Sequence, residues 1–98
     1  MNDKTATGHT QADAVKLAWP IRTPSGEVTE ISFRRGKARD LVAAQRIEPT
    51  DNARRELVLM AMLTEQKLTI EDLEELDLAD LAAVQDAFQQ LWRPAVQF

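Results

Sequence analysis

Hydrophobic and polar residues alternate in two short runs near the start of the chain, the pattern of strands with one buried face. The apolar face of the first run holds Val15, Leu17, Trp19 and Ile21, and the matching face of the second holds Thr29, Ile31 and Phe33. Between them, Thr23-Pro24-Ser25-Gly26 combines a proline of fixed φ with a glycine that accepts positive φ. The pattern predicts a β-hairpin over residues 15–34.

The pattern then changes to helical spacing and predicts helices over about 37–47, 52–66, 70–76 and 78–92. Residues suited to cap these helices precede three of them: Asp51 or Asn52, Thr69 with Asp72, and Asp77. The second helix contains an apolar run over residues 57–63 that covers nearly its whole circumference, so we expect it at the centre of the fold.

A two-stranded hairpin is marginal alone in water, so the helices must cover its apolar face. We therefore predict an α+β fold in which an N-terminal β-hairpin packs against three to four α-helices. Residues 14–93 form the single domain, the polar segment 1–13 is expected to be a disordered N-terminal arm, and 94–98 a C-terminal tail. A chain of 98 residues supplies one small core.

The amino-acid composition argues against several classes of protein function. The chain has no cysteine, which excludes a disulfide framework, a thiolate zinc site and a cysteine nucleophile. The start of the chain lacks the apolar run of a signal peptide, and no segment approaches the ~20 apolar residues that cross a bilayer. We expect a cytoplasmic protein without a membrane segment. The formal charge of −4 argues weakly against general nucleic-acid binding.

The residue types that often act in catalysis do not form a catalytic or ligand-binding motif in this sequence. His9, the only imidazole, lies in the arm, and neither Ser25 nor Ser32 has a nucleophile motif. The acidic segment 71–77 has leucines at helical spacing and no glycine, unlike a calcium loop. Three glycines do not build a nucleotide cradle. We assign no catalytic residue, metal or cofactor.

Charge is distributed unevenly along the chain. Four cations without an intervening acid form what we call the basic junction: Arg34, Arg35, Lys37 and Arg39. Residues 65–86 are strongly acidic. The junction suits phosphate, an acidic protein surface or plain solvation, and the uneven charge suits a complementary partner or a second copy of the chain.

Trp92, Val96 and Phe98 are hard to bury, because Pro94 ends the helix and the chain finishes soon after it. Together with Phe88 of the last helix and the basic junction, they form the candidate partner-binding set.

Several segments together resemble the tail assembly chaperones of Mu-like long-tailed phages, over about residues 15–92. The weaker segments are 28–34, 39–44 and 63–64. The most specific is Ile70-Glu71-Asp72-Leu73-Glu74-Glu75-Leu76-Asp77-Leu78-Ala79-Asp80, which matches the acidic signature E-D-L-x-x-L-D-L-x-D. Gly36-Lys37 and Ile70 replace residues that the family often has as Pro-Thr and Pro, departures that affect how helices begin.

The resemblance implies a non-enzymatic cytoplasmic protein that coats the tape-measure protein during tail assembly and is absent from the mature virion. It also implies a longer form made by frameshifting. The same residues allow two other hypotheses: a small nucleic-acid-binding regulator that uses the basic junction at 34–39, and a minor structural tail protein.

Overall fold

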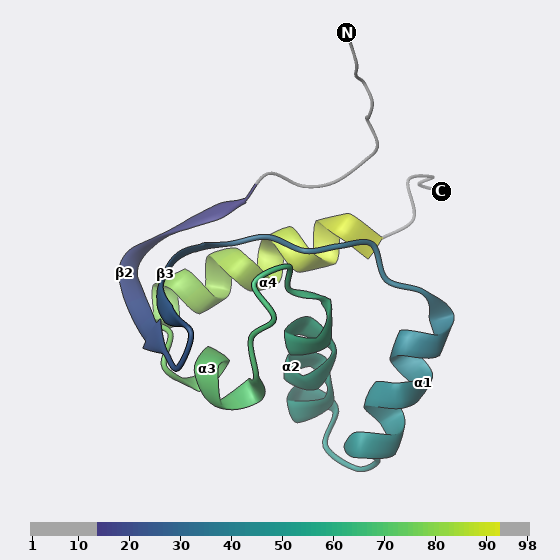
Figure 1. Cartoon of the computed structure of the whole chain (residues 1–98). Coiled ribbons are helices and arrows are strands. Elements are labelled where there is room, and N and C mark those ends of the chain that lie inside the picture. Colours follow the sequence, from purple (N-terminus) through teal and green to yellow (C-terminus); the bar gives the residue numbers. More distant parts are fainter. Residues whose placement is uncertain (1–13, 93–98) are drawn as a thin grey trace, which may run out of the picture.

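The structure is a computed structural model that describes residues 14–92. In chain order the elements are β2 (Val15–Thr23), β3 (Gly26–Ile31), α1 (Ala38–Ile47), α2 (Asn52–Leu63), α3 (Ile70–Glu74) and α4 (Leu78–Trp92). The hairpin followed by four helices confirms the predicted α+β class (Figure 1). The arm expected over 1–13 and the tail expected over 94–98 lie outside the described residues.

The hairpin turn is fixed by short-range contacts. β2 and β3 pair antiparallel around a turn at Pro24 and Ser25, and Gly26 adopts a φ of 127° that other residues avoid. The hydroxyl of Thr23 donates to the Gly26 carbonyl at 2.9 Å and accepts from the Ser25 N–H at 3.1 Å. The turn predicted from these residues is therefore confirmed.

The pairing of the two strands is interrupted midway. Lys16 pairs with Glu30, and the next pair along the strands is Ile21 with Val28. The segment 17–20 of β2 therefore stands opposite a single residue of β3. Extra residues of this kind form a bulge, which bends the strand and changes which side chains face the core.

The bulge overturns part of the predicted face. Trp19, expected beside Leu17 on the buried face, is 66% exposed, and Thr29 is exposed as well. Val28, expected on the other face, packs against the core. Strict alternation fails here because the two strands have unequal numbers of residues between their paired positions.

A buried carboxylate closes the bulge. Asp80, 6% exposed in the first turn of α4, accepts hydrogen bonds from the N–H groups of Ala18 at 3.0 Å and Trp19 at 2.9 Å. These donors would otherwise lack a strand partner. Asp80 therefore joins the hairpin to α4 across most of the chain length.

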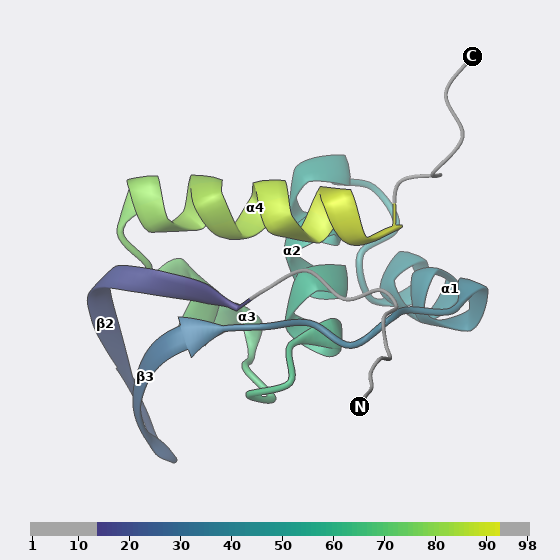
Figure 2. The same cartoon turned by 90° about the horizontal axis from the view of Figure 1, so that it is seen from above.

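The core lies where the hairpin meets the helices. Its most completely buried large side chains are Phe88, Ile31, Met60, Leu73 and Val84. The rings of Phe33 and Phe88 lie 5.3 Å apart at 58°, a favourable tilted arrangement. Figure 2 shows α4 lying along the hairpin and crossing over α2.

α2 is central, as its apolar run predicts, with Val58, Met60, Ala61 and Leu63 buried. It ends at Leu63, whereas the sequence predicts a helix to residue 66. The buried hydroxyl of Thr64 explains the early end, because it donates to the Ala61 carbonyl at 3.0 Å and accepts from the Leu68 N–H at 2.9 Å.

The predicted helix starts are confirmed. Three side chains accept from backbone N–H groups of their helices: Asp51 from Arg54, Thr69 from Asp72, and Asp77 from Ala79. Asp72 also accepts from the Thr69 N–H and completes a capping box. α3 is shorter than predicted and ends at Glu74.

Candidate functional site

An apolar pocket of about 490 Å³ lies between α1, α2 and α4, beneath the connection from the hairpin to α1. Its apolar walls are Leu41, Leu59, Leu63 and Phe88, and charged residues of the basic junction and of α2 stand at its rim. Pockets of this size with apolar walls and a polar rim are typical binding sites. This pocket is the candidate site of the described chain.

The connection at the edge of the pocket depends on Gly36. A Cβ at this position would lie 2.9 Å from Leu63 Cδ1, which is closer than carbon atoms normally pack. The missing side chain therefore lets the connection lie directly against the Leu63 wall.

Asp40 organises the basic junction. It accepts from the guanidinium of Arg34 at 3.1 and 3.2 Å and from the backbone N–H of Lys37 at 2.8 Å. The hydrogen bond from Arg34, followed by that from Lys37, holds the pKa of Asp40 below its ordinary value, and the same pair raises the pKa of Arg34. One cation of the junction is thus neutralised within the chain.

The other three cations of the junction have different environments. Arg35 donates to the Leu91 carbonyl at 3.4 Å, at the C-terminal end of α4, where a cation is favoured by the helix dipole. Lys37 and Arg39 are exposed, and neither side chain contacts an acid at ion-pair distance within the described residues. Two separated free cations offer little for following a phosphate backbone.

The predicted apolar contacts of the last helix are only partly described. Phe88, proposed as a partner contact, is 1% exposed and packs against Phe33. It also helps to line the pocket. Trp92 ends α4, and its side chain, like Val96 and Phe98, lies outside what the structure describes.

α1 presents apolar residues that the sequence analysis did not nominate. Leu41, Val42 and Ile47 are 44%, 45% and 64% exposed, and only Ala44 of this helix is buried. α1 packs mainly on α2 and buries only the small Ala44 there, so its larger side chains stay outside. The sequence signal for this exposure is the composition of the helix, in which three alanines accompany only three large apolar residues.

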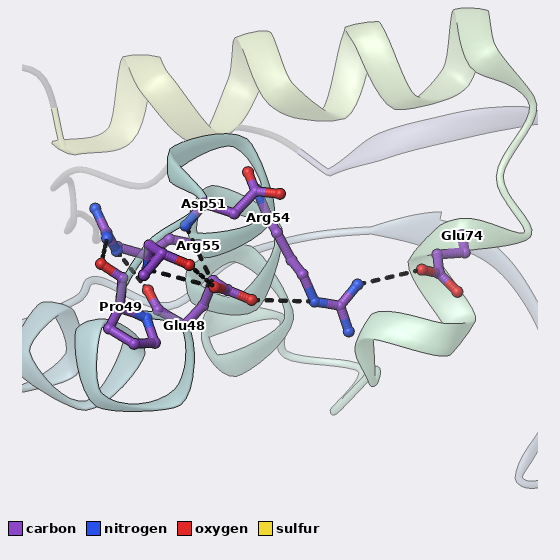
Figure 3. A network of polar contacts seen from close by, with 7 residues as sticks. Glu48, Pro49, Asp51, Arg54, Arg55 and Glu74 are labelled. Carbon is purple, nitrogen blue, oxygen red and sulfur yellow. Dashed lines mark hydrogen bonds and ion pairs between the residues drawn. The ribbon is translucent and has the colours of Figure 1, made fainter.

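A polar network holds the C-terminal end of α1 against α2 (Figure 3). Arg55 donates to the Glu48 carbonyl at 2.8 Å and to the Pro49 carbonyl at 2.7 Å. Arg54 contacts the carboxylates of Glu48 at 3.4 Å and Glu74 at 3.6 Å, and so links the connection between α1 and α2 to α3. These contacts position α1 without burying its apolar side chains.

Between residues 14 and 92, no three His, Cys, Asp or Glu side chains form a group suited to a metal ion. No helix in that range has both the length and the apolar character to cross a membrane.

The family comparison agrees with the sequence resemblance. The family model described as phage tail assembly chaperone proteins, E, or 41 or 14, matches residues 14–93. Searches of curated proteins and of solved structures gave no match.

Proposed function

Because the chain belongs to the family of phage tail assembly chaperones, we propose that it binds the tape-measure protein and keeps it soluble while the tail is assembled. The pocket between α1, α2 and α4 is the proposed docking site. The observation that carries this assignment is an apolar pocket beside a helix whose own large apolar side chains are exposed.

The shape of the site favours one mode of recognition. Amphipathic helices bind by placing apolar side chains from one face into a groove lined by helices. The apolar walls supply the affinity, and the exposed cations Lys37 and Arg39 favour acidic residues flanking the client's apolar face. One contact of this size is weak, but many copies on one long client gain avidity.

The proposal includes a place of action. The protein acts in the host cytoplasm, without catalysis, and leaves before the virion matures. A permanent minor tail protein would instead be found in purified particles. We expect mass spectrometry of purified virions to detect the tape-measure protein and not this chain.

A co-expression experiment tests the site. We expect the tape-measure protein to be soluble with the wild-type chain and largely insoluble with Leu41→Glu, which puts a charge into the pocket wall. Loss of one buried leucine contact lowers affinity by roughly 10- to 100-fold. Gln90→Glu is the control, because it adds the same charge to an exposed position of α4 that does not line the pocket, and it should leave the client soluble.

Two results would contradict the proposal. If the tape-measure protein is equally soluble without this chain, the chain is not its chaperone. If Leu41→Glu keeps the tape-measure protein as soluble as the wild-type chain does, the pocket is not the docking site.

A further inference from the structure

The C-terminal end of α4 lies beside the pocket between α1, α2 and α4. The backbone carbonyl of Leu91 accepts a hydrogen bond from Arg35 at 3.4 Å, and Gly36, the next residue along the connection, lines the pocket. Phe88, about one helical turn before the end of α4, lines it as well. Figure 1 shows the end of α4 next to the connection that leads to α1. The chain therefore leaves α4 at the edge of the pocket.

The residues that follow α4 are chemically suited to an apolar pocket. The sequence continues with Arg93-Pro94-Ala95-Val96-Gln97-Phe98, in which two large apolar side chains flank an uncharged one. Burial of Val96 and Phe98 therefore places no charge against the apolar walls. Pro94 opposes continuation of the helix and favours an extended backbone at the residue before it, so these residues are free to turn away from the helix axis.

This segment, residues 93–98, is long enough to enter the pocket. Extended chain spans about 3.3 Å per residue, so Val96 can lie up to about 13 Å, and Phe98 up to about 20 Å, from Trp92. Phe88 in the pocket lining is only about 6 Å from Trp92 along the helix axis. Leu41, which also lines the pocket, is 44% exposed and has apolar area left to cover.

We propose that residues 93–98 fold back and occupy the pocket of their own chain, with Val96 and Phe98 against its apolar walls. A segment tethered this close has an effective concentration in the millimolar range, so weak contacts suffice to fill the pocket. The consequence for activity rests on the proposed function: the segment covers the docking site until a client displaces it. The affinity for every client is then lowered in proportion to the fraction of chains whose pocket is open.

Disulfide cross-linking tests the position of the segment without any client. The chain has no cysteine, so a pair of introduced cysteines gives the only possible disulfide within it. Gln97→Cys places one thiol between the two apolar side chains, and Ala38→Cys places the other at an exposed position of the pocket lining. We expect this pair to oxidise within one chain, to a product of monomer mass, at a rate that does not depend on protein concentration.

Ala83→Cys with Gln97→Cys is the matched control. Ala83 is an exposed alanine of α4 that does not line the pocket, and it lies about 14 Å from the end of the helix, within reach of the segment. We expect this pair to cross-link at least about tenfold more slowly. Adding Val96→Ser and Phe98→Ser to the first pair should slow its cross-linking to a similar extent. Equal rates for the two pairs, or a disulfide formed only between two chains, would overturn the proposal.

Competition for the tape-measure protein tests the consequence. Val96→Ser with Phe98→Ser opens the pocket of the full chain, and a pocket that was filled nine-tenths of the time then binds about tenfold more tightly. When this variant and the wild-type chain are co-expressed with a limiting amount of client, we expect about tenfold more of the variant in the purified complex. Gln97→Ser, in the same segment, should be recovered equally with wild type.

The competition also has results that contradict the proposal. Less of the double variant than of wild type in the complex would mean that Val96 and Phe98 contact the client instead of covering the pocket. Equal recovery would mean that the segment does not cover the docking site. Cross-linking needs no client, so failure of the proposed function, which the co-expression with Leu41→Glu detects, is distinguishable from failure of this inference.

Discussion

The hairpin and α1 use their apolar residues in opposite ways. The hairpin buries Leu17, Ile21 and Ile31 against α4 and the other helices, and Asp80 fastens its backbone to α4. α1 buries only Ala44, leaves its large apolar side chains exposed, and is held at its end by polar contacts.

This difference separates stability from binding. Burial of apolar area supplies most of the folding free energy, so the hairpin, α2 and α4 carry most of the stability of the domain. α1 contributes little burial, and its exposed leucine, valine and isoleucine remain available to partners. A small protein thus offers apolar surface on one helix without weakening its core.

The largest expected loss of stability comes from a change in the buried core that the hairpin and α4 form. Phe88→Ala removes a fully buried ring and should lower the free energy of unfolding by about 3–5 kcal/mol. Ile47→Ala, in the exposed face of α1, should change it by less than about 0.5 kcal/mol. Urea denaturation measures both, and similar losses for the two variants would break the comparison.

A smaller effect is expected at the junction of hairpin and α4. Asp80→Ala leaves the N–H groups of Ala18 and Trp19 without an acceptor and should lower the free energy of unfolding by about 2–3 kcal/mol. Asp80→Asn keeps one acceptor oxygen and should lose less. Asp77→Ala, which removes only the helix cap, should lose about 1 kcal/mol. A urea midpoint for Asp80→Ala that equals or exceeds the midpoint for Asp77→Ala would contradict the role of Asp80.

The smallest effect belongs to the start of α1 and depends on pH. The pKa of Asp40 is lowered in the folded chain by the Arg34 hydrogen bond, so its ionised form stabilises the fold above its ordinary value of 3.8. That contribution is lost as the pH falls through the lower, folded pKa. Because Arg34 is 47% exposed, Asp40→Asn should cost less than about 1 kcal/mol at pH 7.

The pH series supplies its own control. The difference in unfolding free energy between wild type and Asp40→Asn should shrink in strongly acidic solution, and Arg34→Gln should give the same trend from the other side of the contact. If these differences in unfolding free energy are the same at pH 7 and in strongly acidic solution, the Arg34–Asp40 contact does not stabilise the start of α1.

Features set by neighbouring residues could be predicted from the sequence. The turn before Gly26, the caps at Asp51, Thr69 and Asp77, and the central position of α2 are confirmed. Each depends on backbone preferences or on hydrogen bonds that span a few residues. The acidic signature that begins at Ile70 likewise identified the family from the sequence.

Features that join distant segments were decided only by the tertiary structure. The bulge that exposes Trp19 depends on Asp80, far along the chain, and the burial of Phe88 depends on Phe33. The pocket exists because three helices meet, and Leu41 stays partly exposed because α1 packs mainly on α2 and buries only Ala44. Periodicity specifies which residues share a face, but packing between elements decides whether that face is covered.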